Sequence, residues 1–344
     1  ETKEQLPKYI VALEIGGTNI NSLLLQYNKG LDVANLKIKD NDQCKAFHYK
    51  TSSNPEETVK SFCQDIKNQV KYSSTIISVG VSSFGPIGIS KQRDNYGFIL
   101  NTPKKAWINF NLVGSIANYL GIPKDRINIE TDVNSAALLE YRFGNHILND
   151  TCNSSPTITK ENSKQTEIDS LAYITIGTGC GVGIVAGGKQ IQGLLHPEGG
   201  HVPVKRHSKD DFEGICMYHK DCAEGMITNV SVKERKGLSN VDDIIDLPDD
   251  DPVWDYWGFY VAQVCLNLLY LVSVEKIIIG GGMVNREILL KKVRESFAEL
   301  NNDYISLPQT SEKGLEEFIV RTEFKNDAGI LSAVVLALDN FERK

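Results

Sequence analysis

The sequence predicts an internally duplicated α/β protein with a cleft between its two halves. Two observations lead to this fold. A strand, a glycine turn and a second strand occupy residues 9–27, and a similar unit recurs at 171–186. After each unit, apolar strands alternate with helical patterns. The chain has 344 residues, which is long enough for two domains.

The first half is expected to open as a strand meander. Its first strand, residues 9–15, breaks at a pair of glycines, and a helix starts further on at Asn54. Asn is a good N-cap, proline follows at the first helical position, and two acidic residues occupy the first turn. The predicted elements are strands at 9–15, 20–27, 34–38 and 45–50, a helix from 54 to about 71, a strand at 75–82, a helix at 111–120, a strand at 126–130 and a helix at 133–143.

The second half follows a polar segment. Residues 145–168 are dominated by Asn, Ser, Thr, Lys and Glu, which predicts a flexible surface insertion. Residues 253–273 place apolar side chains at helical spacing and predict a long buried helix. The other predicted elements are strands at 171–176, 181–186 and 276–279, and helices at 285–299 and 327–341.

Composition argues against several classes of protein. The formal net charge of −7 argues against nucleic-acid binding, because phosphate contacts need clustered Lys and Arg. No apolar run approaches the roughly 18 residues of a membrane span. The polar first residues are not expected to act as a secretory signal. The seven cysteines show no disulfide-like pattern, so we expect a reducing, cytoplasmic setting.

Cysteine and histidine cluster in the second half. Cys216, His219 and Cys222 form a Cys-x2-His-x2-Cys pattern. Zinc prefers four nitrogen or sulfur ligands in tetrahedral geometry, and one tight loop with this spacing can supply three of them. The fourth ligand would be His201 or His207. The sequence therefore predicts a zinc site.

Three glycine-rich turns follow strands. Glycine lets backbone N–H groups approach phosphate oxygens closely, and threonine adds a hydroxyl donor. Tight turns also use glycine for conformation alone, so the three together carry more weight than any one. Neither the Walker pattern nor a strand-coupled Gly-x-Gly-x-x-Gly fingerprint is present. The candidate nucleotide-binding residues are Gly16, Gly17, Thr18, Gly177, Thr178, Gly179, Gly280, Gly281 and Gly282.

Three acidic residues are candidates for polar chemistry. Asp132 lies between a predicted strand and helix, where it could act as a general base toward a substrate hydroxyl. The alternative role is a helix N-cap. Glu198 and Glu224 flank the metal loop, and their acceptor-only carboxylates suit sugar hydroxyls.

Eight stretches together resemble the ROK family, which contains sugar kinases and sugar-responsive repressors. The resemblance covers about residues 9–340 and is nearest to the bacterial-type fructokinases. It implies an actin/hexokinase-like, duplicated ribonuclease-H-type fold of two domains with a cleft between them. The stretches are GVSSFGPIGI (80–89), NTPKKAW (101–107), TDVNSAALLE (131–140), ITIGTGCGVG (174–183), QGLLHPEGGH (192–201), CMYHKDCAEG (216–225), IIIGGG (277–282) and NDAGILSAVVLA (326–337).

The resemblance also implies residue roles. Asp132 is similar to the family's catalytic base, and Glu14 would organise Mg²⁺ through water. His201, Cys216, His219 and Cys222 match structural zinc positions, so that zinc would shape the sugar site. Many relatives have Lys at Asn19 and Asn at Thr131, and the latter departure favours fructose over glucose. The implied sugar-binding residues are Asn101, Thr131, Glu198, His201 and Glu224.

These expectations define a function. The chain is expected to phosphorylate D-fructose to fructose 6-phosphate with ATP as co-substrate and Mg²⁺ as cofactor. The alternatives are a glucose or mannose kinase of the same family, or a non-catalytic sugar sensor. An N-terminal domain is expected at 1–130, with the helix 327–341 packed back on it, and a C-terminal domain at 131–326. A homodimer is expected from the resemblance.

Overall fold

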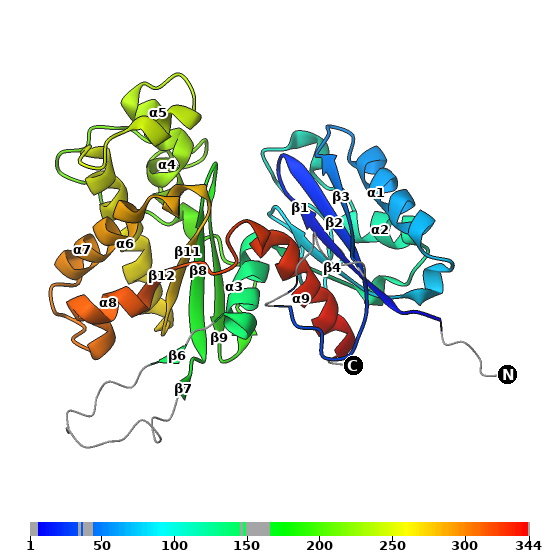
Figure 1. Ribbon diagram of the computed structural model, residues 1–344. Helices are drawn as coiled ribbons and strands as arrows, with labels where there is room; N and C mark the ends of the chain where they lie inside the picture. Colours follow the sequence, from blue (N-terminus) through cyan, green and yellow to red (C-terminus); the bar gives the residue numbers. More distant parts are fainter. Residues whose placement is uncertain (1–5, 34–35, 37–43, 145–146, 149–165, 343–344) are drawn as a thin grey trace, which may run out of the picture. The chain divides into compact units, whose positions relative to one another are not determined.

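The computed structural model describes residues 6–33, 36, 44–144, 147–148 and 166–342 (Figure 1). They form two compact units. The first contains residues up to 143 together with 192–196 and 326–344, and the second contains 144–191 and 197–325. No helix among the described residues is both long and apolar enough to span a bilayer.

The two units repeat one sheet design. In the first, the strand order is β3-β2-β1-β4-β5, and in the second it is β10-β9-β8-β11-β12. In each unit, the second strand of the hairpin is antiparallel to the first. The strand on the other side of the first strand, β4 or β11, is parallel to it. The predicted duplication is therefore confirmed. The strands are β1 (Tyr9–Ile15), β2 (Asn19–Gln26), β3 (Cys44–Lys50), β4 (Ile76–Ser83) and β5 (Ile127–Thr131), then β8 (Ser170–Ile176), β9 (Cys180–Ala186), β10 (Lys189–Gln190), β11 (Ile277–Gly280) and β12 (Ile319–Arg321).

Two sequence predictions fall largely outside the described residues. Of the strand expected at 34–38, only Leu36 is described, and it lies in no strand. Most of the insertion predicted at 145–168 is likewise not described. At its base, β6 (Ile147–Leu148) pairs antiparallel with β7 (Thr166–Glu167).

Four helices cover the first sheet. Asn54 caps α1 as expected, because its side chain accepts a hydrogen bond from the Glu57 N–H at 3.2 Å. α9 packs across β1 and β4. Gly80 permits this close approach, since a Cβ there would lie 1.9 Å from the Ala333 carbonyl oxygen. The helices are α1 (Pro55–Gln69), α2 (Leu112–Leu120), α3 (Asp132–Phe143) and α9 (Ala328–Glu342).

The structure places residues 131–143 in the first unit, whereas the sequence assigned them to the second domain. The reason is packing. α3 lies against α9, and Arg142 forms an ion pair with Asp339 between these two helices. The C-terminal helix α9 packs on the first sheet, and α3, which packs on α9, belongs to the same unit.

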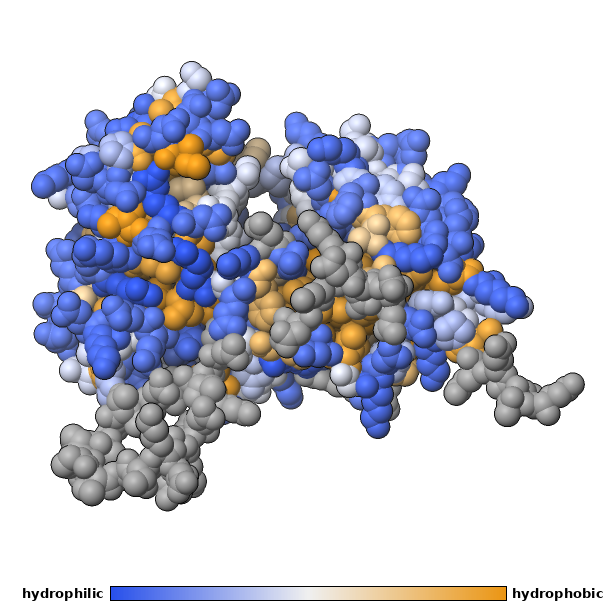
Figure 2. All heavy atoms as spheres, viewed as in Figure 1, coloured by the Kyte–Doolittle hydropathy of each residue, from blue (hydrophilic) through white to orange (hydrophobic). Residues whose placement is uncertain are grey.

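In the second unit, α6 is the central helix. It packs against α7 and α4 and buries Trp254, Trp257 and Tyr260. Its bounds agree with the prediction of a long buried helix at 253–273. Hydrophilic side chains predominate on the visible face of each unit (Figure 2). The helices are α4 (Ala223–Ile227), α5 (Asn229–Lys236), α6 (Val253–Val272), α7 (Glu287–Asn301) and α8 (Glu312–Phe318).

Candidate functional site

Two carboxylates lie at the carboxyl ends of strands in the first unit. Glu14 is the penultimate residue of β1, and Asp132 follows β5 directly. Both strands are parallel to β4, so their carboxyl ends share one edge of the sheet. Thr131 caps α3, because its hydroxyl accepts a hydrogen bond from the Asn134 N–H at 3.2 Å. The N-cap role considered for Asp132 therefore belongs to Thr131.

The surroundings of both carboxylates raise their pKa values. Burial raises the pKa of Asp132 to about 6, and the negative charge of Glu14 adds to the increase. Burial also raises the pKa of Glu14, and Asp327 adds to it, whereas a hydrogen bond from Asn21 opposes the rise. A carboxylate that ionises near pH 6 can accept a proton at neutral pH, and closely placed negative charges favour a cation.

Sequence reasoning missed several residues around this pair. Asp327 is the first residue of the helix predicted at 327–341, and its negative charge helps to raise the pKa of Glu14. Gly329 gives Glu14 room, because a Cβ there would lie 2.0 Å from Glu14 Oε1. In the sequence, Asp327 and Gly329 appear only as a single Asp and a single Gly near the start of a predicted helix. This pattern does not identify a site unless the fold is known.

Glu130 is a second buried acid that sequence reasoning did not select. Burial raises its pKa to about 7, although the Thr131 N–H donates to it at 2.8 Å and the Gln192 amide also donates. The hydrogen bond between Gln192 and Glu130 helps to hold residues 192–196 on the first unit. The Ile87 N–H adds a second link, with a hydrogen bond to His196 Nε2 at 3.2 Å.

The first two glycine turns are tight and expose a threonine. In the first unit, the Gly16 N–H donates to the Asn19 carbonyl at 2.9 Å, and Thr18 is exposed. In the second unit, the Gly177 N–H donates to the Gly179 carbonyl at 2.9 Å, and Thr178 is exposed. The two units therefore carry matching hairpin turns.

The third turn shows why glycine is needed at two of its positions. A Cβ at Gly280 would lie 2.0 Å from the Tyr173 hydroxyl, and Gly281 has a φ of 91°. Packing and conformation therefore explain these two glycines. At Gly282, nothing lies within 4 Å of an added Cβ. Of the three glycines in this turn, Gly282 is the one with open space where a side chain would project.

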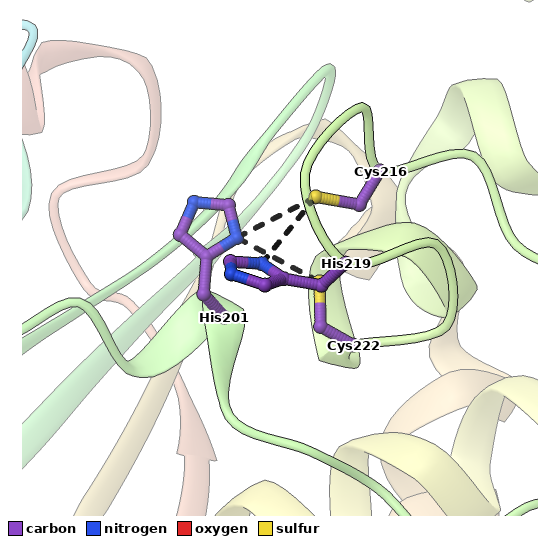
Figure 3. Close-up of side chains that lie close together, drawn as sticks. All are labelled: His201, Cys216, His219 and Cys222. Carbon is purple, nitrogen blue, oxygen red and sulfur yellow. Dashed lines mark hydrogen bonds between the residues drawn. The ribbon is translucent and has the colours of Figure 1, made fainter. Parts of the chain in front are cut away.

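Four predicted metal ligands converge in the second unit. One ligand atom from each of His201, Cys216, His219 and Cys222 lies within 4.8 Å of all the others, and Figure 3 shows the side chains pointing toward one another. The Cys216 Sγ lies 3.8 Å from Nδ1 of both His201 and His219, and the Cys222 Sγ lies 3.6 Å from His201 Nδ1.

These separations fit a tetrahedral zinc site. With metal–sulfur and metal–nitrogen bonds of ordinary length, sulfur and nitrogen ligands lie roughly 3.6 Å apart. His201 enters the cluster from a short 3₁₀ helix, Gly199–His201. His207 instead packs edge-on against Phe259, with ring centroids 5.0 Å apart. Of the two histidines left open by the sequence, the structure brings His201 to the cysteines.

A buried ion pair anchors the segment that joins His201 to Cys216. Arg235 Nη2 lies 3.1 Å from Asp210 Oδ2, and these side chains are 7% and 2% exposed. The Tyr260 hydroxyl donates to the same oxygen at 2.8 Å and accepts from the His207 N–H at 3.2 Å. α5 and α6 therefore fix the segment from both sides.

The candidate sugar-binding residues are divided between the units. In the second unit, Glu224 lies beside the metal cluster, with its Oε1 3.9 Å from His201 Nδ1. Its other oxygen accepts from the Cys180 N–H at 3.0 Å. Glu198 is exposed next to the 3₁₀ helix. The other candidates, Asn101 and Thr131, are in the first unit, as is the candidate base Asp132.

Comparisons with known proteins identify the class. A model of the ROK family matches residues 10–340, and the chain belongs to this family. It is 33% identical over 301 residues to a fructokinase of Lactococcus lactis subsp. cremoris, covering 87% of this chain and 91% of that protein. It is 35% identical over 260 residues to a fructokinase of Pediococcus pentosaceus, covering 76% and 80%.

A solved structure supports the fold. The crystal structure of a ROK family glucokinase from Streptomyces griseus, in complex with glucose and AMPPNP, superposes with a TM-score of 0.63 at 20% identity. The match covers 95% of this chain and 98% of that one. The predicted two-domain, actin/hexokinase-like fold is therefore confirmed.

The anchor of the metal loop can be tested by removing one charge. Asp210→Asn should lower the free energy of unfolding by about 3–5 kcal/mol, because the buried Arg235 charge loses its partner. Urea denaturation measures this change. Glu295→Gln is the control, since it removes an exposed ion pair at 3.8 Å and should cost about 0–1 kcal/mol. Equal effects of the two substitutions would show that the Asp210 pair has no special structural role.

Proposed function

We propose that the chain is an ATP-dependent sugar kinase that converts D-fructose to fructose 6-phosphate. The observation that carries this proposal is the Asp132 carboxylate, whose pKa of about 6 suits a general base at neutral pH. Two curated fructokinases that are 33% and 35% identical over most of the chain support this choice of sugar.

Asp132 would take the proton from the sugar's primary hydroxyl. The hydroxyl oxygen then forms a bond to the terminal phosphorus of ATP, the bond between that phosphorus and the bridging oxygen breaks, and ADP leaves. Bound Mg²⁺ would neutralise phosphate charge, and Glu14 would hold it through water. The raised pKa of Glu14 supports this role, since a nearby cation would offset the burial of its charge and its repulsion from Asp327.

The remaining predicted residues would bind the substrates. The ATP phosphates and nucleoside would contact the three glycine turns. The contacting residues would be Gly16, Gly17, Thr18, Gly177, Thr178, Gly179, Gly280, Gly281 and Gly282. Fructose would contact Asn101, Thr131, Glu198, His201 and Glu224. Zinc on His201, Cys216, His219 and Cys222 would hold His201 in place beside Glu224, a structural role distinct from the chemistry. The separations among these ligands support that assignment.

The cellular location and the oligomeric state are further parts of the proposal. The lack of a disulfide-like cysteine pattern supports a reducing, cytoplasmic location. A homodimer is expected from the family resemblance.

The substrate assignment predicts a preference among hexoses. ADP release with Mg-ATP should show the highest kcat/KM with fructose, because Thr131 stands where glucose-handling relatives carry Asn. Glucose, mannose and N-acetylmannosamine complete the panel. A higher kcat/KM with glucose or mannose would favour the alternative function, a glucose or mannose kinase of the same family. No ADP release with any sugar would favour a non-catalytic sensor.

The assigned base predicts a mutational and a pH effect. Asp132→Asn should lower kcat by about 10²–10⁴ and leave fructose binding largely intact. Since a raised pKa keeps the acid protonated below about pH 6, wild-type kcat/KM should fall as the pH drops through that value. Asp303→Asn is the control, because Asp303 is exposed and Asn tolerates its φ of 59°. Wild-type turnover in Asp132→Asn would contradict the assignment.

The zinc assignment predicts a fixed metal content. The purified chain should contain about one zinc per molecule by elemental analysis, because four nitrogen and sulfur ligands converge. Cys222→Ser should lose this zinc and raise the KM for fructose. His207→Ala should retain it, since His207 packs against Phe259 away from the cluster. A zinc-free wild type, or full zinc content in Cys222→Ser, would refute the site.

A further inference from the structure

Three polar side chains form a row across the first sheet. Asn21 on β2 is paired with Glu14 on β1 and with His48 on β3. Directly paired residues on neighbouring antiparallel strands have adjacent side chains. The Asn21 Nδ2 donates to Glu14 Oε2 at 2.7 Å, and the Asn21 Oδ1 lies 2.7 Å from His48 Nδ1. The row thus links an exposed histidine to the carboxylate beside Asp132.

The direction of each hydrogen bond follows from the groups involved. An ionised carboxylate only accepts, so the Asn21 amide must present its NH₂ group to Glu14. Its carbonyl oxygen then faces His48 and requires a donor. His48 must therefore carry hydrogen on Nδ1. This holds for both the neutral and the protonated imidazole, so the bond does not depend on the charge of His48.

The row fixes one oxygen of Glu14. Asp132 and Asp327 place negative charge near this carboxylate, and His48 contributes an opposing influence. Oε2 is bound to Asn21, whereas Oε1 lies beside Gly329, where a hydrogen replaces a side chain. The hydrogen bond to Oε2 therefore sets the plane of the carboxylate, and with it the position of Oε1.

We propose that Asn21 and His48 are positioning residues that orient the Glu14 carboxylate toward a hydrated divalent cation. The proposal rests on the proposed function only through the role of Glu14 in holding Mg²⁺. His48 sets the orientation of the Asn21 amide. Without it, the amide can rotate and turn its oxygen toward the carboxylate, which repels it. Neither residue touches the reacting atoms.

The first test is spectroscopic and requires no activity. In the full chain labelled with ¹⁵N-histidine, the His48 ring should show the Nδ1–H tautomer at a pH where it is neutral. Asn21→Leu removes the acceptor, and the ring should return to the Nε2–H tautomer that an unconstrained imidazole prefers. The signal is assigned with His48→Asn. An Nε2–H tautomer in the wild type would overturn the proposal.

The second test measures the cation. His48→Leu and Asn21→Leu should each weaken Mn²⁺ binding to the chain with ADP, followed by electron paramagnetic resonance, by about tenfold, as expected for partners that orient metal-binding groups. In the kinase assay, the Mg²⁺ concentration for half-maximal rate should rise by a similar factor, with the KM for fructose within about twofold.

The matched control is His48→Asn. Its amide nitrogen is the same number of bonds from the backbone as Nδ1 and can donate to Asn21, so Mn²⁺ affinity should stay near the wild-type value. Wild-type Mn²⁺ affinity in Asn21→Leu would overturn the proposal. If the wild type fails to phosphorylate fructose, the proposed substrate fails, whereas the tautomer and Mn²⁺ measurements still decide this proposal.

Discussion

The burial of two carboxylates, Glu14 and Asp132, at one edge of the first sheet is the constraint on which the candidate site depends. Glu14 lies near the carboxyl end of β1 and Asp132 directly follows β5. Partial burial of both weakens the screening that water would provide. Each therefore favours a neighbour with positive charge or a hydrogen-bond donor. The surrounding structure supplies the Asn21 amide to one and the Val133 N–H, at 2.9 Å, to the other.

Close backbone packing brings these groups together. Gly80 lets α9 lie directly on the sheet, and Gly329 at the start of that helix makes room for the Glu14 carboxylate. α9 in turn holds α3, which begins at Asp132. Residues more than 300 positions apart in the chain thus define one edge of the first unit. A larger side chain at either glycine would separate elements that carry charged groups.

The sequence predicted the parts of this structure that depend on local pattern. Asn54 and Pro55 identified the start of α1, the strand predicted at 276–279 matches β11, and Cys-x2-His-x2-Cys identified three members of one cluster. The sequence alone could not decide whether His201 or His207 is the fourth ligand. The outcome depends on α6, because Phe259 on that helix packs against the His207 ring. The Thr131 cap was also hidden, since Thr and Asp at adjacent positions are both good N-caps.

The residues that sequence reasoning missed act through contacts distant in the chain. Asn21 and His48 are ordinary polar residues of two strands, and only the register aligns them with Glu14. Glu130 stands two residues before Asp132, but its partner Gln192 comes from a distant segment. Lone polar residues such as these carry no spacing signal, so their roles emerge only from the fold.

The most direct test of this account is the ionisation of Asp132 itself. Carbon-13 NMR of the labelled aspartate carboxyl should give a pKa of about 6 in the wild type. Glu14→Gln removes the neighbouring negative charge and should lower that pKa. A wild-type value near ~4, the ordinary value for aspartate, with no response to Glu14→Gln, would contradict the account.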